Sequence, residues 1–264
     1  MLKLENIRKT FNAGTVNQKV ALNGLNLEMQ EGDFVTVIGG NGAGKSTMLN
    51  AIAGVFPVDS GRILIDGTDV TGLPEYKRAK YIGRVFQDPM MGTAATMQIE
   101  ENLALAARRG KPRTLRAGIT RADRESYREQ LKILDLGLED RLTTKVGLLS
   151  GGQRQALTLL MATLQQPKLL LLDEHTAALD PKTAAKVLEA TQRFVEKSHL
   201  TTMMITHNMR DAIAYGNRLV MMYEGRIVVD VSGEEKNHLT VEQLLNLFSK
   251  ASGSDEADDK LLLS

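Results

Sequence analysis

The chain has 264 residues, 42% of them hydrophobic and 25% charged, with a formal net charge of +1 at pH 7. This composition is typical of a folded globular protein, and it excludes a fibrous or wholly disordered chain and a strong overall attraction to nucleic acid or anionic lipid. The absence of cysteine excludes disulfides, thiolate catalysis and cysteine-based zinc sites, and it favours a cytosolic setting.

The first third of the chain predicts mainly short strands. Residues 3–11 and 20–30 alternate apolar and polar side chains around a turn containing Asn and Gly, which indicates antiparallel strands. Residues 32–40, "GDFVTVIGG", predict a strand that runs into glycines, and residues 45–55 have the apolar spacing of a helix. Two more strands are expected, over residues 61–71 and over residues 79–88 with Gln87 at the end.

Residues 90–163 have helical periodicity, which predicts an inserted helical lobe. Its helices are expected over residues 96–109, 124–138 and 150–165. The segment 108–124 between the first two is rich in Arg and Lys and has no aromatic residue. A solvated loop is its simplest interpretation, with a contact to lipid headgroups or nucleic acid as the alternative.

The rest of the chain, from residue 167 onward, predicts alternating strands and helices. The run "PKLLLLDE", 167–174, is continuously apolar before its acids and predicts a strand buried on both faces of a parallel sheet. A helix near 181–198 and a buried strand over 200–207 follow, and residues 218–230 predict a hairpin that turns at Glu224 and Gly225. The last helix, near 240–250, leads into an acidic tail from Ser254 to Lys260, which we expect to be frayed.

The segment "GGNGAGKST" fits the pattern G-x-x-x-x-G-K-[ST] and lies between a predicted strand and a predicted helix, as a phosphate-binding loop requires. Its glycines allow backbone N–H groups to surround phosphate oxygens, and the helix N-terminus adds a partial positive charge. Lys45 is expected to reach the β and γ phosphates, and Ser46 to offer its hydroxyl to Mg²⁺.

Polar side chains follow the predicted strands at the edge where open α/β folds bind ligands. Asp173 is expected to hold Mg²⁺, and the next residue, Glu174, points elsewhere and is the candidate general base. The amide of Gln87 is placed to contact Mg²⁺ or the attacking water, although a simple turn is the alternative for this residue. His207 is a candidate partner of the γ-phosphate or of the water. Phe11 is a candidate for stacking on adenine, with a core position as the alternative.

The motif "LSGGQ", residues 149–153, opens an amphipathic helix. Ser150 and Gln153 form a capping-box pattern, and the two glycines between them leave backbone N–H groups open at the helix start. This end is therefore a second predicted anion site. The simplest explanation for two such sites in one chain is that two molecules pair, so that the anion site of one molecule completes the phosphate site of the other.

Together these motifs resemble those of the ATP-binding cassette (ABC) ATPases, and the resemblance runs from about Leu2 to Asp230. It implies an α/β fold: a P-loop NTPase core with a mostly parallel sheet, an N-terminal antiparallel β subdomain and an inserted helical subdomain. We expect one ABC ATPase domain over residues 1–235, with the core at 1–89 and 164–235 and the helical subdomain at 90–163. Residues 236–264 are expected to form a C-terminal helix and acidic tail.

The resemblance also assigns roles to individual residues. It implies catalysis by Glu174, His207 and Gln87, with Mg²⁺ held by Ser46, Gln87 and Asp173. It places the D-loop at 178–180. His175 departs from the family pattern, in which proline is usual at this position, so it is expected to loosen the turn or to add a titratable group near Glu174. The residues implied in binding ATP are Phe11, Gly39, Gly40, Asn41, Gly42, Ala43, Gly44, Lys45, Ser46, Thr47, Ser150, Gly151, Gly152, Gln153 and Asp180.

The family implies a homodimer that sandwiches two ATP molecules, each between one subunit's phosphate loop and the other subunit's "LSGGQ" motif. The leading function is ATP hydrolysis that drives a separate membrane permease, with small-solute import and a substrate-binding protein expected and no nucleic acid. No stretch approaches the roughly 18 apolar residues of a membrane span, so the expected location is the cytoplasmic face of the membrane, held by the permease. Met90, Met91 and Met97 are candidates for contact with that partner, with core packing as the alternative.

Three other functional classes share part of this sequence pattern. A soluble ABC ATPase acting on nucleic acid or ribosomes usually has two fused cassettes, coiled coils or zinc modules, and the sequence shows none of these. The ATPase of an exporter shares the compact single-cassette layout and stays open. A P-loop kinase would leave "LSGGQ" without a purpose.

Overall fold

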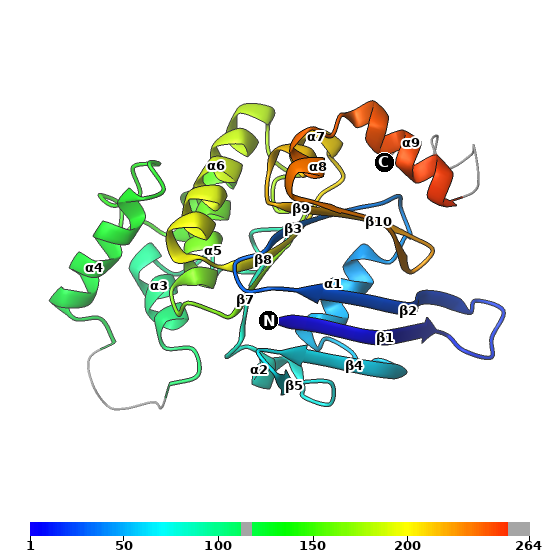
Figure 1. Cartoon of the computed structure of the whole chain (residues 1–264). Helices are drawn as coiled ribbons and strands as arrows, with labels where there is room; N and C mark the ends of the chain where they lie inside the picture. Colours follow the sequence, from blue (N-terminus) through cyan, green and yellow to red (C-terminus); the bar gives the residue numbers. More distant parts are fainter. Residues whose placement is uncertain (112–117, 253–264) are drawn as a thin grey trace.

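The structure is a computed structural model that describes residues 1–111 and 118–252. Part of the basic segment 108–124 and the acidic tail from Ser254 to Lys260 lie outside these ranges. Two sheets lie on either side of the helix that follows the glycine-rich loop (Figure 1). The fold is α/β, as the sequence predicts.

The larger sheet has the strand order β10-β9-β3-β8-β7-β6, and every neighbouring pair in it is parallel except the β9–β10 hairpin. The mostly parallel core is therefore confirmed, and the hairpin turns at Glu224 and Gly225 as predicted. Its strands are β3 (Phe34–Ile38), β6 (Ile82–Val85), β7 (Leu169–Asp173), β8 (Thr201–Ile205), β9 (Arg218–Tyr223) and β10 (Arg226–Ser232).

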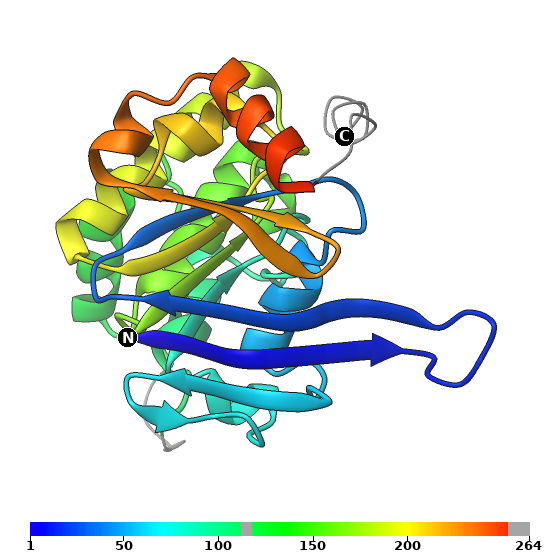
Figure 2. The ribbon, with the colours of Figure 1, turned by 45° about the vertical axis from the view of Figure 1, so that its right-hand side comes forward.

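The smaller sheet is antiparallel and has the strand order β2-β1-β4-β5. It lies beside the larger sheet, and the β1–β2 hairpin extends beyond it (Figure 2). This confirms the predicted N-terminal antiparallel part. Its strands are β1 (Leu2–Phe11), β2 (Lys19–Met29), β4 (Ser60–Ile65) and β5 (Thr68–Asp69).

Helices cover both faces of the larger sheet, and three short helices were not predicted. These are α2, α7 and α8, each six residues or fewer, too short to show a helical period in the sequence. The helices are α1 (Lys45–Ala53), α2 (Glu75–Arg78), α3 (Ile99–Ala107), α4 (Arg121–Lys132), α5 (Gly151–Thr163), α6 (Pro181–Ser198), α7 (Met209–Ala214), α8 (Gly233–Asn237) and α9 (Val241–Ser252).

The leucines of β7 show how the sequence builds two cores on one sheet. Leu169 and Leu171 pack with α1 and the smaller sheet, whereas Leu170 and Leu172 pack with the helices of the other face. All four are fully buried, which confirms the prediction of a strand covered on both sides. The second core also includes residues of α3, α4 and α5, so the inserted helices pack directly onto the sheet.

Several predicted boundaries were wrong. The strand expected to end at Gln87 stops at Val85, because Val85 forms the last pair with β7 and Gln155 of α5 then binds the carbonyl of Phe86. The helix expected over 124–138 spans Arg121–Lys132, because Thr120 and Asp123 form a capping box at its start and Asp135 adopts a left-handed conformation beyond its end. β8 likewise ends at Ile205, two residues before His207.

The C-terminal helix α9 is part of the packed structure. Leu244 and Phe248 are buried against β9 and β10, and the ring of Phe248 packs edge-on against Tyr223 at 5.5 Å between centroids. This helix closes the β9–β10 end of the sheet (Figure 1).

Candidate functional site

The glycine-rich loop, residues 39–44, connects β3 to α1. Gly44 has φ of 104°, and a Cβ there would lie 2.6 Å from the carbonyl oxygen of Ala21, so no larger residue fits. α1 begins at Lys45 without a side-chain cap and without an acidic residue in its first turn. Its N-terminal N–H groups and their partial positive charge are therefore open to an anion.

Lys45 is buried inside this loop. Its Nζ donates hydrogen bonds to the carbonyl oxygens of Gly39, at 2.5 Å, and Gly40, at 3.3 Å. Burial lowers the pKa of Lys45, while the carboxylates of Glu174 and Asp173 act in the opposite direction. The ammonium group is therefore held next to the loop and within electrostatic reach of both strand-end carboxylates.

A cleft of about 320 Å³ lies against the loop and is lined by residues 41–47 together with Glu174 and Phe11. Phe11 ends β1, and its ring packs edge-on against Phe56 at 5.3 Å between centroids. Phe11 is only partly buried, so it is not a core residue, and its stacking on adenine stays a prediction. Lys19 and Ala21 of β2 complete the wall, and nothing in the sequence pattern pointed to Lys19.

Asp173 is the last residue of β7, as predicted, and its carboxylate is largely shielded from solvent. Burial raises the pKa of Asp173, whereas the positive charge of Arg84 acts in the opposite direction. Arg84 Nη2 lies 3.5 Å from Asp173 Oδ2 and donates a 2.6 Å hydrogen bond to Asn50 Oδ1 of α1. Arg84 was not among the predicted site residues. Its position in the predicted strand before Gln87 was a signal that it would lie near the sheet edge that holds Asp173.

Glu174 lies between two cavities. It lines the cleft beside the loop, and with His207 it lines a second cavity of about 390 Å³. His207 Nδ1 lies 3.7 Å from Glu174 Oε2. Backbone hydrogen bonds from Glu174 N to Ile205 and from Thr206 N to Val37 hold the ends of β3, β7 and β8 together, so the general-base candidate and the histidine meet at one sheet edge.

Gln87 is exposed, and it does not line either cavity. His175 is buried, only 2% exposed, and burial lowers its pKa to about 4. Its Nε2 is 3.1 Å from Thr191 Oγ1, which itself donates to the carbonyl of Val187, so Nε2 is the donor. His175 is thus neutral at pH 7, and it ties the turn to α6, whereas the sequence led us to expect that it would loosen the turn or add a titratable group near Glu174.

The motif at 149–153 forms the predicted capped helix start. Ser150 Oγ accepts a hydrogen bond from Gln153 N, and Gln153 Oε1 accepts one from Ser150 N. A Cβ at Gly152 would clash with Thr183, so α5 begins in close contact with α6. Asp180 caps α6 by accepting from Thr183 N, and hydrogen bonds from the side chain and the backbone N–H of Thr183 lower the pKa of Asp180.

No residue of 149–153 lines the cleft beside the glycine-rich loop in the described ranges. The structure therefore brings together the loop, Asp173, Glu174 and His207, and it leaves the second anion site apart from them. The donors expected around a metal, which are the Ser46 hydroxyl, the Asp173 carboxylate and the Gln87 amide, are all hard oxygen ligands of the kind that Mg²⁺ prefers. Within the described ranges, no three or more His, Asp or Glu side chains form a group that could hold a metal ion.

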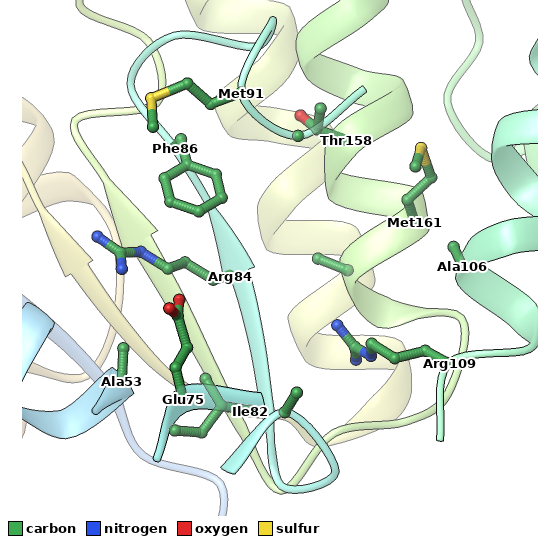
Figure 3. A pocket seen from close by; sticks show the side chains of 13 residues that line it. Ala53, Glu75, Ile82, Arg84, Phe86, Met91, Ala106, Arg109, Thr158 and Met161 are labelled. Atoms are coloured by element: carbon green, nitrogen blue, oxygen red, sulfur yellow. The ribbon is translucent and has the colours of Figure 1, made fainter. Parts of the chain in front are cut away.

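A groove of about 330 Å³ separates the sheet edge from the inserted helices (Figure 3). Arg84, Phe86 and Glu75 lie on one side, and residues of α3 and α5 lie on the other. Met91, which is 70% exposed, and Gly92 complete it, and Met90 is exposed nearby. The two methionines are therefore not core residues, whereas Met97 is partly buried.

Comparison with known proteins places these features in a family. Residues 22–177 match the family model described as ABC transporter. The chain is 45% identical over 251 residues to the tyrosine transport ATP-binding protein of Clostridioides difficile (strain R20291), covering 95% of this chain and 100% of the relative. It is 33% identical to the spermidine/putrescine import ATP-binding protein PotA of Haemophilus influenzae, covering 89% of this chain but 59% of that relative.

Solved structures give the same result. A dimeric ATP-binding cassette in a post-hydrolysis state with bound ADP and Pi superposes with a TM-score of 0.75 at 31% identity, covering 88% of this chain and 98% of that one. The ADP conformation of an ATP-binding cassette of an ABC transporter superposes with a TM-score of 0.78 at 26% identity, covering 99% and 98%. Within the described residues, no helix is both long and apolar enough to cross a bilayer.

Proposed function

The chain belongs to the ABC transporter family, and from that membership we propose that it is the ATP-hydrolysing subunit that drives a separate membrane permease. Proteins of this family are ATPases, and their cassettes work as dimers with transmembrane partners. The observation that carries the proposal is the cleft beside the glycine-rich loop, which Glu174 lines together with Lys45 and Ser46. A phosphate chain in this cleft lies between a cationic loop and a carboxylate able to accept a proton from water.

The residues of the loop and of the strand ends have roles that their positions support, whereas Gln87, which lines neither cavity, is assigned to the metal from the family resemblance. Lys45 and the open N–H groups of α1 bind the phosphates, and Ser46, Asp173 and Gln87 would hold Mg²⁺. The metal, when bound, neutralises phosphate charge. Glu174 orients water and accepts its proton, and His207, 3.7 Å from Glu174, donates a hydrogen bond to the γ-phosphate. Phe11, at the cleft rim, stacks on the adenine ring.

The second anion site completes the cleft of another copy. Residues 149–153 do not line their own chain's cleft, and a dimeric cassette with 31% identity superposes on this fold. The start of α5 would then supply N–H groups to the γ-phosphate of the partner copy. Asp180 lies next to this helix start and would contact the dimer interface.

The groove of Figure 3 is the proposed contact for the permease. It joins apolar side chains such as Phe86 and Met91 with two guanidinium groups, those of Arg84 and Arg109. Burial lowers the pKa of Arg109, and no acidic group opposes that effect. A permease segment with apolar side chains and one carboxylate fits this surface in shape and charge.

Import of a small solute is the proposed direction of transport. Two of the relatives described above are named as transport or import ATP-binding proteins, and the one that matches along its whole length is named for tyrosine. An amino acid is therefore the cargo to test first, delivered by a substrate-binding protein. The chain would lie at the cytoplasmic face of the membrane, held there by the permease.

The proposal is tested by purifying tagged Glu174→Gln protein from its native cells in mild detergent with ATP. Glu189→Gln is the matched control, since Glu189 is exposed on α6 and pairs with Arg193 at the surface. We expect Glu174→Gln to retain a multi-spanning protein and a substrate-binding protein, and to hydrolyse no ATP, while Glu189→Gln turns over normally. Co-purification of ribosomal proteins or nucleic acid in place of a membrane protein would refute the proposed function.

A further inference from the structure

Arg84 connects three elements that carry different parts of the site. It lies in β6, its Nη2 donates to Asn50 of α1, and the same nitrogen lies 3.5 Å from Asp173 at the end of β7. Arg84 and Asp173 are 13% and 17% exposed, so solvent screens their interaction much less than that of a surface pair. The helix of the phosphate loop and the strand of the metal-binding carboxylate are therefore joined through one guanidinium group.

The same side chain forms part of the groove wall. Its guanidinium carbon lies 4.5 Å from the centre of the Phe86 ring, and Figure 3 shows Arg84 between that ring and the carboxylate of Glu75. Its Nε is buried and has no hydrogen-bond partner among residues 1–111 and 118–252. The guanidinium group that contacts Asp173 therefore also packs against Phe86, a residue of the groove.

We propose that Arg84 is a positioning residue of the metal site, which holds the Asp173 carboxylate in place and is itself held by the groove residue Phe86. The inference rests on the proposed function only in its assignment of Asp173 to the metal. A carboxylate oxygen fixed by Arg84 leaves the other oxygen oriented for the ion or its bound water. Outer partners of metal ligands typically contribute about 10-fold to 100-fold in metal affinity.

The test measures Mn²⁺ binding to the ATP-loaded chain by electron paramagnetic resonance, which requires no turnover and no permease. We expect Arg84→Met to weaken Mn²⁺ binding at least about tenfold. Arg84→Lys should restore part of it, because lysine returns the positive charge but not the planar set of N–H donors of the guanidinium group. The affinity for ATP measured in EDTA should stay unchanged. Arg62→Met is the matched control, since Arg62 pairs with Asp69 at 3.2 Å on the exposed smaller sheet.

A double-mutant cycle tests the connection to the groove. Phe86→Ala should weaken Mn²⁺ binding about threefold in the wild-type background, and it should add nothing once Arg84 is Met, because its effect passes through the guanidinium. Unchanged Mn²⁺ affinity in Arg84→Met, or an equal Phe86→Ala effect in both backgrounds, would overturn the inference. Loss of permease co-purification with normal Mn²⁺ behaviour would instead contradict the proposed function alone.

Discussion

At the scale of single residues, the proposed nucleotide site consists of charged side chains placed around the cleft beside the glycine-rich loop. Lys45 lies inside the loop, Asp173 lies beside Arg84, and Glu174 lies 3.7 Å from His207. Each of these groups is supported by a neighbour on another element, so the geometry is set before a nucleotide binds. Substitutions at these positions should therefore change binding or turnover more than stability.

Lys45→Ala should abolish measurable ATP binding, because the phosphates lose their main counter-ion. Titration with a fluorescent ATP analogue checks this. Lys168→Ala is the control, since Lys168 is an exposed residue paired with Asp66. Nanomolar to micromolar affinity in Lys45→Ala would show that the lysine is not needed for binding.

His207→Ala should lower kcat by at least about tenfold, because a hydrogen bond to the transition state is lost. The substitution should leave ATP affinity nearly unchanged, since the loop and Lys45 remain. Steady-state ATPase kinetics measure both, with the exposed His238→Ala as the control. An unchanged kcat would reduce His207 to a structural residue.

His175 should make the protein less stable in mild acid. Its pKa is about 4 in the folded protein and about 6.5 for an ordinary exposed histidine, so the unfolded chain binds more protons between these pH values. The free energy of unfolding therefore falls as the pH falls through this window, by about 2 kcal/mol between pH 7 and pH 5. Denaturant titrations in EDTA should show a flatter pH dependence for His175→Gln and no change for His238→Gln.

At the scale of elements, the predicted strands and helices formed where a clear apolar pattern or cap marked them, whereas the short helices without such a signal were missed. β7 was recognisable because four leucines face two cores, and α5 because Ser150 and Gln153 cap it. The short helix α8 was not predicted, because buried Lys236 holds it by tertiary contacts. Gln87 was placed at a strand end because local pattern cannot reveal that Gln155, far along the chain, ends the pairing of β6.

Lys236 shows how such a short helix is fixed. Its Nζ donates to the carbonyl oxygens of Ile213, Tyr215 and Gly216 at 2.7, 2.7 and 3.0 Å, and burial lowers its pKa to about 8. Lys236→Met would leave three carbonyl groups without this donor, so we expect a loss of about 2 kcal/mol in unfolding free energy. Thermal unfolding checks this, and Lys186→Met on the exposed face of α6 should change the melting temperature little.

At the scale of the whole molecule, the proposal has two anion sites in one chain, each completed by a partner copy. The sequence motifs predicted both sites and the edge that holds Asp173, Glu174 and His207. They could not show Arg84 between the Asp173 carboxylate and the groove, because that contact joins β6, β7 and α1 across the fold. The groove depends on the packing of the inserted helices against the sheet, for which the single sequence carried no signal beyond exposed methionines.

The most direct test of this account is the molecular mass of Glu174→Gln in solution with ATP, measured by size-exclusion chromatography with light scattering. The account predicts a monomer of 29.0 kDa without ATP and about twice that mass with it. Adding Ser150→Asp, which can still cap α5 but places a negative charge against the γ-phosphate, should return the protein to a monomer that still binds ATP. A monomer with ATP in Glu174→Gln, or a dimer that persists after Ser150→Asp, would contradict the shared site.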